Sequence, residues 1–221
     1  MLVLQNMDEL MDLELDAPEL EGKGNRVFAA GHACVCNPLK KAHYPQDWYA
    51  RSLLIMYRIN SHLRRIPQNC AFTSQHNTPS EAQSIGPDPA VGPLGFMNGG
   101  LQVVNPSTAI YNQILSYMEH NAIDMDFADQ SLLSSLYRGR WVPLPYVYNA
   151  LKTLRWEGIH TQIWQDGSVK NMHYILAPKP WDQDGGKGLN ESDIVTHRWW
   201  RDQNEERLER EKKKGIQIDG F

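Results

Sequence analysis

From residue 26 onward, the pattern of apolar and polar positions alternates between strand-like runs and helical spacing. Strand-like runs lie at 26–36, 101–104, 141–149 and 169–176. After Asn105 and Pro106, the spacing predicts a helix whose buried face carries Ile110, Ile114, Tyr117 and Met118. A second helix ends at Gly139 and buries Leu132, Leu133, Leu136 and Tyr137. Strands alternating with helices predict an α/β fold with a mainly parallel sheet.

The chain begins with an apolar run, "MLVL", that is typical of the interior of an element rather than of a solvated terminus. A short helix is predicted to follow, with Asn6 as its cap. Its apolar face would carry Met7, Leu10, Met11 and Leu15.

Three segments depart from this pattern. Residues 49–66 are basic and apolar without a single acid, and we interpret them as an anomalous insertion. Residues 73–95 are rich in Pro, Ser, Gln and Gly, which predicts a long loop. Residues 182–221 read as a polar linker followed by a charged helical tail, which Trp199 and Trp200 would anchor at its start.

Composition and charge exclude some classes of partner. The 221 residues are 41% hydrophobic and 22% charged, with a net charge of −4. A nucleic-acid surface would need a concentrated basic face, and the tail mixes its bases with acids. No window is apolar for long enough to span a membrane, and no targeting signal is visible. Together with the cysteine usage, this indicates a cytoplasmic protein.

The three cysteines are too few for a disulfide framework. Cys34 and Cys36 lie close to His32 in the sequence, which is compatible either with a metal site or with burial in a strand. Zinc sites usually need a second pair of ligands, and the sequence offers none that is recognisable. We therefore interpret the cysteines as buried structural residues.

Three short motifs could carry chemistry. In "FMNGG", Asn98 is followed by Gly99 and Gly100, which allow a backbone to approach a ligand closely. In "ADQS", Asp129 lies near a helix start, where a carboxylate either caps the helix or meets a ligand hydroxyl. In "MHYILAPKPW", His173 ends a strand and Lys179 follows in a loop. An imidazole suits a divalent metal and an ammonium suits phosphate. A histidine at a strand end is also common as a structural residue, and a loop lysine is also common as a solvated one.

The order and spacing of these motifs resemble glycosyltransferase family 8, the family of glycogenin and the galactinol synthases. The resemblance runs from Met1 to about Trp181, apart from 49–66, and rests on "FMNGGLQVVNPS", "DFADQSLLS" and "MHYILAPKPW". The segment "CAFTSQH" and the tail look most like fungal members.

The resemblance implies a GT-A fold, a Rossmann-like nucleotide-diphospho-sugar transferase domain, and retaining transfer of glucose or galactose from a UDP-sugar. The acceptor would be a glycan, a polyol or a protein. By motif, His173 is implied as a ligand of Mn²⁺ and Lys179 as a contact of the diphosphate. Asn98, Gly99 and Gly100 would bind the donor, while Asp129 and Gln130 would serve catalysis.

Two departures from the family pattern matter. Leu176 stands where the family often has glycine, three residues after the metal-binding histidine. The Asp-x-Asp motif that holds the metal has no counterpart in a matching place, because Asp124-Met125-Asp126 lies in the wrong element.

In the family, the stretch matching Met1 directly follows that Asp-x-Asp motif. We therefore expect residues 1–181 to be the C-terminal part of a GT-A domain, truncated so that the N-terminal half of the sheet is missing. Three functions follow as hypotheses: a sugar transferase, a catalytically incompetent remnant without the Asp-x-Asp motif, and an interaction module that uses the charged tail.

Overall fold

The computed structural model describes residues 1–41, 70–88, 96–121, 128–182 and 188–216. The proposed insertion at 49–66 and the Asp124–Asp126 stretch lie outside these residues. Within the described part of the chain, no helix is long and apolar enough to cross a membrane.

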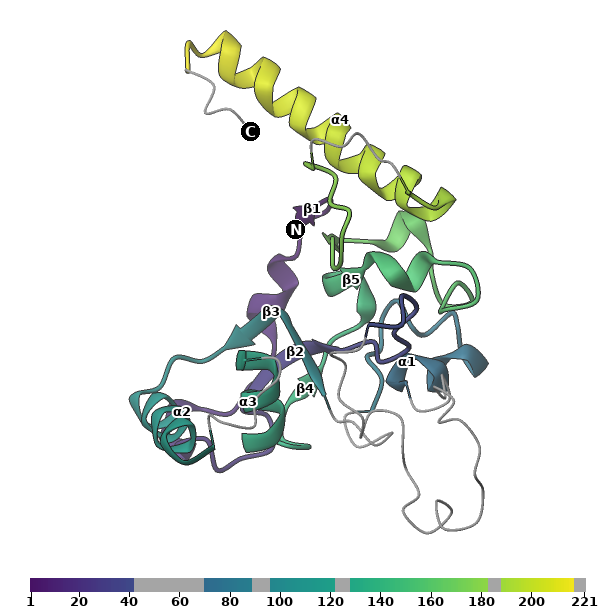
Figure 1. The fold of residues 1–221 in the computed structure, drawn as a ribbon. Helices are drawn as coiled ribbons and strands as arrows, with labels where there is room; N and C mark the ends of the chain where they lie inside the picture. Colours follow the sequence, from purple (N-terminus) through teal and green to yellow (C-terminus); the bar gives the residue numbers. More distant parts are fainter. Residues whose placement is uncertain (42–69, 89–95, 122–127, 183–187, 217–221) are drawn as a thin grey trace, which may run out of the picture.

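The described strands form two small sheets of three strands each, with helices beside them, so the mixed α/β prediction is confirmed (Figure 1). One sheet has the order β3-β2-β4, from β2 (Phe28–His32), β3 (Met97–Val104) and β4 (Val142–Pro143). The other has the order β1-β6-β5, from β1 (Leu2–Val3), β5 (Ala150–Leu151) and β6 (Asn171–His173).

A mainly parallel sheet was the wrong prediction. Strand β2 pairs parallel with β4 but antiparallel with β3, and β6 pairs parallel with β5 but antiparallel with β1. An apolar run in the sequence does not tell whether β3 pairs parallel or antiparallel with β2, since either pairing buries the same residues.

Helices α2 (Thr108–Asn121) and α3 (Ala128–Leu136) pack beside the β3-β2-β4 sheet. Their contacts form an aromatic core in which the rings of Phe28 and Trp141 stack 6.1 Å apart. Helix α2 starts later than predicted, because the Asn105 side chain donates to the Asp16 carbonyl at 3.0 Å instead of capping the helix. Met118 was predicted to be buried and is exposed.

The amino-terminal stretch forms 3-10 turns, η1 (Asp8–Asp12) and η2 (Pro18–Leu20), where an α-helix was predicted. Asn6 does act at the start of η1, since its side-chain oxygen accepts from the Asp8 amide at 2.7 Å. Leu10 is buried against Ala29 and Leu144, whereas Met11 is 84% exposed, so its predicted burial is wrong.

Several short helical turns complete the fold, and their brevity hides them from sequence periodicity. The predicted loop 73–95 overlaps α1 (Ala71–Ser74) and contains η5 (Gln75–Asn77), and turns follow up to residue 84. The strand-like run 141–149 is a strand only at β4, and it continues as η7 (Tyr146–Asn149). Two further 3-10 turns among the described residues are η8 (Lys152–Arg155) and η9 (Asp166–Ser168).

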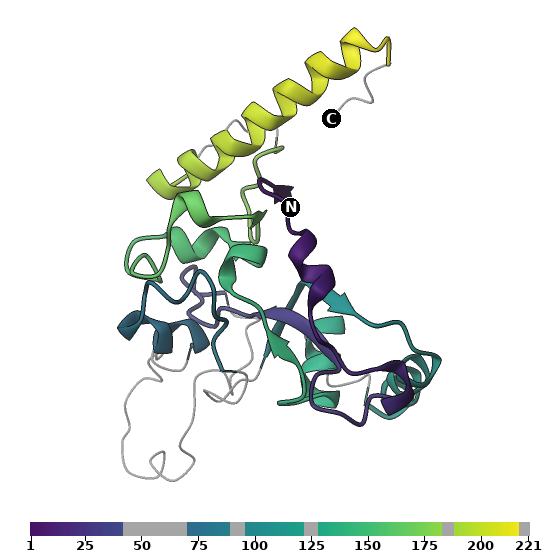
Figure 2. The same ribbon diagram turned by 180° about the vertical axis from the view of Figure 1, so that it is seen from behind.

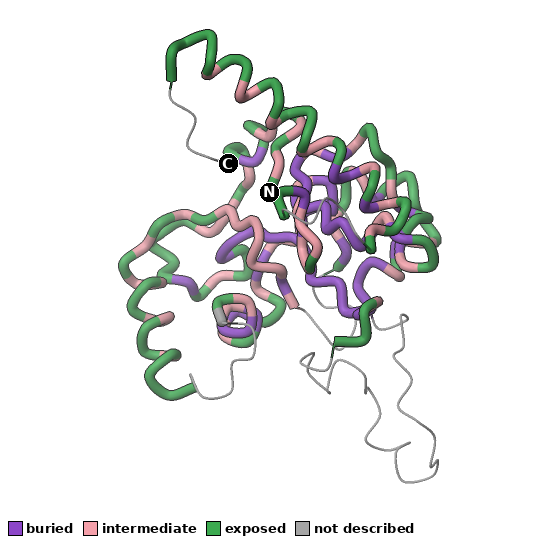
Figure 3. Tube along the Cα trace, turned by 45° about the horizontal axis from the view of Figure 1, so that its top comes forward, coloured by how far each residue is buried: buried purple, intermediate pink, exposed green. Residues whose placement is uncertain are grey.

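The β1-β6-β5 sheet lies in a second and larger core. Tyr146, Leu151, Met172 and Tyr174 are almost fully buried there. Figure 3 shows the buried segments of both cores in purple.

Helix α4 (Glu191–Lys213) is the charged tail, and it begins inside the segment that was predicted to be a linker (Figures 1 and 2). Asn190 caps it by accepting from the Asp193 amide at 2.8 Å. Its first turns face the second core, and Trp199 and Trp200 pack there as predicted. Its C-terminal half projects away from the rest of the molecule (Figure 2).

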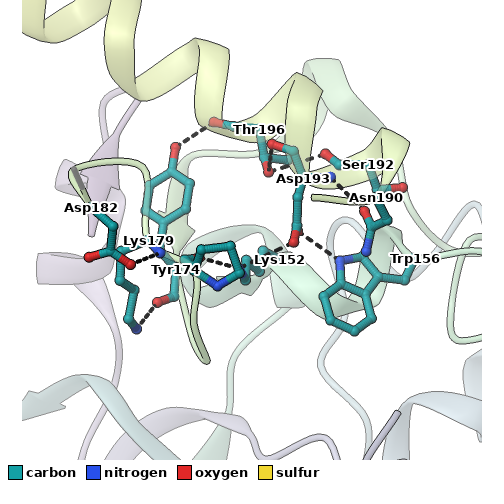
Figure 4. Close-up of polar contacts among 10 residues, drawn as sticks. Lys152, Trp156, Tyr174, Lys179, Asp182, Asn190, Ser192, Asp193 and Thr196 are labelled. Atoms are coloured by element: carbon teal, nitrogen blue, oxygen red, sulfur yellow. Dashed lines mark hydrogen bonds and ion pairs between the residues drawn. The ribbon is translucent and has the colours of Figure 1, made fainter. Parts of the chain in front are cut away.

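A buried ion pair holds the start of α4 (Figure 4). The Lys152 ammonium lies 3.4 Å from the Asp193 carboxylate and donates to the Pro178 carbonyl at 2.7 Å. The Trp156 indole donates to the other carboxylate oxygen of Asp193 at 2.9 Å. The side chains of Lys152 and Asp193 are 0% and 3% exposed, so both charges are removed from water and depend on each other.

His197, on the same helix, makes stability depend on pH. Its ring is buried 5.8 Å from the Tyr174 ring, and burial, followed by the charge of Lys152, lowers the pKa of His197 from 6.5 to about 4. Between these values the unfolded chain binds a proton that the folded protein does not. This contribution to stability is therefore complete above pH 6.5 and is lost as the pH falls toward 4.

We expect His197→Phe to reduce the loss of unfolding free energy between pH 7 and pH 4, measured by urea denaturation at several pH values. His120→Phe, at an exposed position on α2, is the matched control and should leave the slope unchanged. An identical pH slope in His197→Phe and the unmodified chain would contradict this account.

Candidate functional site

The site is built on an irregularity in strand β3. Ala30 pairs with Gln102 and His32 pairs with Met97, so β3 uses more residues than β2 between these two pairs. The extra residues bulge out of the ladder, as is common beside functional sites. They include Asn98, Gly99 and Gly100, which lie within the strand and not before it as the sequence suggested.

A chain of side-chain hydrogen bonds joins this bulge to both sheets. His173 Nδ1 lies 2.9 Å from Asn149 Oδ1, and Asn149 Nδ2 donates to Asn98 Oδ1 at 2.8 Å. Asn98 Nδ2 in turn faces Gln130 Oε1 at 3.3 Å, and that oxygen also accepts from the Gly99 amide at 3.3 Å. We call His173, Asn149, Asn98 and Gln130 the polar chain.

Positions 99 and 100 require glycine because the side chains of Asp129 and His173 lie close to their backbone. A Cβ on Gly99 would lie 2.5 Å from an Asp129 carboxylate oxygen, and a Cβ on Gly100 would lie 2.4 Å from the His173 ring. Any side chain there would displace these groups. The structure thus brings together six of the seven residues that the sequence singled out: Asn98, Gly99, Gly100, Asp129, Gln130 and His173.

His173 is kept neutral by its surroundings. Burial first, and then the positive charges of the amino terminus and Lys179, lower the pKa of His173 from 6.5 to about 4. The amino terminus is near because Leu2 pairs with Met172 and Val3 with Asn171, an antiparallel register that brings Met1 toward His173. A neutral imidazole is the form that binds metals or accepts protons.

Lys179 lies on the loop after β6, outside the polar chain. Its ammonium donates to the Tyr174 carbonyl, and its backbone amide donates to the Asp182 carboxylate at 2.6 Å. Burial, followed by the charge of Lys152, lowers the pKa of Lys179. The ammonium is thus near enough to His173 to affect its titration, while its contact in this structure is a carbonyl oxygen.

Leu176, the residue that departs from the family pattern, has a left-handed backbone conformation. Its φ angle is 60°, in the left-handed region that side chains rarely occupy. A left-handed residue therefore stands in the segment between His173 and Lys179.

We expect Gly100→Ala to push the His173 ring away from Asn149 and to lower the free energy of unfolding by about 1–3 kcal/mol. The shift is measurable as a change in the NMR signals of the His173 ring. Gly167→Ala is the matched control, because a Cβ there meets nothing within 4 Å, and it should change stability by less than about 0.5 kcal/mol. Unchanged NMR signals of the His173 ring in Gly100→Ala would contradict the close packing of this ring against Gly100.

Sequence reasoning missed Asn149, which links His173 to Asn98. The side chain is 2% exposed although it follows an apolar run, "PYVYNA". A single amide inside such a run is a signal, because buried amides need hydrogen-bond partners.

Sequence reasoning also missed which residues lie beside Cys34 and Cys36 in the fold. His32 does not join them, but Cys70 and His160 do, and the ligand atoms of Cys34, Cys36, Cys70 and His160 all lie within 4.8 Å of one another. All four residues are buried, as was predicted for the cysteines.

The sequence of this chain is similar to those of two kinds of glycosyltransferase, the galactinol synthases and glycogenin. It is 30% identical over 211 residues to galactinol synthase 2 of Arabidopsis thaliana, covering 94% of this chain and 52% of that protein. It is 29% identical over 203 residues to galactinol synthase 2 of Ajuga reptans, covering 90% of this chain and 56% of that protein. It is 30% identical over 121 residues to glycogenin of Neurospora crassa, covering 54% of this chain and 17% of that protein.

These similarities support the resemblance to glycosyltransferase family 8 that the motifs indicate. The chain spans about half or less of the length of the curated relatives it matches. No family profile matches the chain, and no solved structure matches it.

Proposed function

We propose that this chain forms part of a retaining glycosyltransferase that moves a hexosyl group, glucose or galactose, from a UDP-sugar to an acceptor hydroxyl. The observation that carries the proposal is the polar chain, which gathers residues of the three separate family-like motifs at the bulge of β3. The similarity to galactinol synthases and glycogenin supports the same reaction class.

The chemistry of each side chain suits it to a different role in the proposed reaction. Asn98 and Gln130 carry amides that suit sugar hydroxyls, and the close-packed Gly99 and Gly100 let the backbone approach the donor. Asp129 lies against Gly99, where a carboxylate would orient a hydroxyl of the donor or the acceptor. Lys179 would turn from the Tyr174 carbonyl to the diphosphate and stabilise the charge on the departing UDP.

Mn²⁺ fits the described residues only in part. The neutral ring of His173 can supply one ligand, since Asn149 fixes the ring by its Nδ1 atom. Mn²⁺ prefers oxygen ligands, and among the described residues no cluster of three metal-binding side chains includes His173. We therefore derive no step through the metal.

The shortage of oxygen ligands favours a second candidate. A chain with one histidine and no carboxylate pair at that position would bind a UDP-sugar weakly and transfer nothing. This catalytically incompetent form predicts the same polar chain, so the two candidates differ in activity and not in fold.

A calorimetric titration with UDP, with and without Mn²⁺, tests the proposal. We expect binding that tightens with Mn²⁺ and that weakens about 10-fold or more in Lys179→Met, because the diphosphate loses its cationic partner. Lys23→Met, an exposed control, should bind as the unmodified chain does. No detectable UDP binding under either condition would contradict the proposal.

The acceptor class would be a glycan, a polyol or a protein, as in the range spanned by the family. With the thiols of all three cysteines free, we infer a reducing, cytoplasmic setting for the reaction.

A further inference from the structure

The cluster of Cys34, Cys36, Cys70 and His160 shares no residue with the polar chain. Its members come from three separate parts of the chain. Cys34 and Cys36 follow β2, Cys70 directly precedes α1, and His160 lies in the turns after η8. The fold therefore brings together four side chains that are unrelated in sequence.

The ligand atoms converge at the spacing that a metal requires. All four lie within 4.8 Å of one another, and Cys36 Sγ lies 3.3 Å from His160 Nε2. In a tetrahedral zinc site with Zn–S bonds of about 2.3 Å, neighbouring ligand atoms are about 3.6–3.8 Å apart. Closing the cluster around an ion needs movements of about 1 Å or less.

His160 is oriented as a metal-binding histidine is oriented. Its Nε2 atom faces the sulfur of Cys36, while its Nδ1 atom lies 2.9 Å from His76 Nε2. A partner on the far nitrogen fixes the tautomer and the plane of a ligating imidazole. The Phe72 ring, 5.6 Å from the His160 ring, packs beside it.

We propose that Cys34, Cys36, Cys70 and His160 bind one structural Zn²⁺ ion, with three thiolates and the Nε2 atom of His160 as its ligands. Three sulfurs and one imidazole in a closed, buried, tetrahedral arrangement are typical of structural zinc. Binding releases the three thiol protons and leaves no open position for substrate. The ion joins the end of β2 to the start of α1 and to the turns around His160.

The test measures zinc in the full chain, produced without a polyhistidine tag in zinc-supplemented medium and passed through gel filtration. We expect about one zinc per chain by atomic emission, and less than a tenth of that in Cys36→Ser and in His160→Ala. His120→Ala should keep the full content, because that histidine is exposed on α2 and bonds its own helix at the Ser116 carbonyl.

Two further measurements test the proposal even if the variants that lack a zinc ligand fail to fold. Co²⁺ added to the unmodified chain should give the visible absorption bands of a tetrahedral thiolate site, and His160→Cys should keep Co²⁺ with a shifted spectrum. His76→Phe should keep one zinc but release it to a chelator about 10- to 100-fold faster.

A folded, reduced chain with no zinc and no cobalt bands would overturn the proposal, as would full zinc content in Cys36→Ser. A disulfide formed within the cluster in protein prepared under reducing conditions would overturn it too. None of these results depends on whether the chain transfers sugars.

Discussion

Replacing Asp193 by alanine is expected to lower the free energy of unfolding by about 3–5 kcal/mol. The substitution leaves the Lys152 ammonium buried, with its hydrogen bond to the Pro178 carbonyl but without the carboxylate that balances its charge. It also removes the acceptor of the Trp156 indole. An uncompensated buried charge costs far more than the lost attraction between two charges in water.

The measurement is equilibrium denaturation in urea, followed by circular dichroism. Glu211→Ala is the control, because its pair with Arg207 lies on the surface of the same helix, and it should cost less than about 1 kcal/mol. Lys152→Met combined with Asp193→Leu should recover much of the lost stability, since it removes both charges together. Equal losses in Asp193→Ala and Glu211→Ala would contradict the account of a buried pair.

Asn149→Ala is expected to reduce turnover of a UDP-sugar about 10- to 100-fold. The amide contacts both His173 and Asn98, and its loss frees the imidazole to rotate and leaves Asn98 with one partner fewer. The rate falls because the reacting groups are no longer held in position, even though no group that touches the substrate has been removed.

Asn171→Ala separates this effect from a general loss of stability. Asn171 is as buried as Asn149, but its side chain donates to the Tyr148 carbonyl and makes no hydrogen bond to the polar chain. It should lower stability and leave the turnover of folded protein nearly unchanged. Equal losses of turnover in the two variants would show that Asn149 acts through stability alone.

Residue types and their order could be read from the sequence because they are local. The glycine pair after Asn98 and the histidine at the end of β6 needed no knowledge of the fold. Their meeting did, since the bulge in β3 and the contact between Gly100 and His173 depend on strands that are far apart in sequence. Asn149 was missed for the same reason, as its partners come from β3 and β6.

The partners of the buried charges and thiols were missed, because burial of a polar residue leaves no periodic signal. Asp193 stands in a segment that looks like a solvated linker, yet its partner Lys152 lies in η8. Cys70 and His160 carry no spacing motif with Cys34 and Cys36, and only the packing of α1 and the later turns unites them. Apart from η1, which lies within the short helix predicted after Asn6, the 3-10 turns were missed because each is too short to set up a period.

The central claim is that the polar chain and its glycines form part of a site for hexosyl transfer from a UDP-sugar. The most direct measurement is the release of UDP from UDP-glucose and UDP-galactose by the purified chain, with and without Mn²⁺, compared with His173→Ala. The account predicts UDP release that Mn²⁺ increases and that His173→Ala abolishes. No release from either sugar, or equal release by His173→Ala, would contradict it.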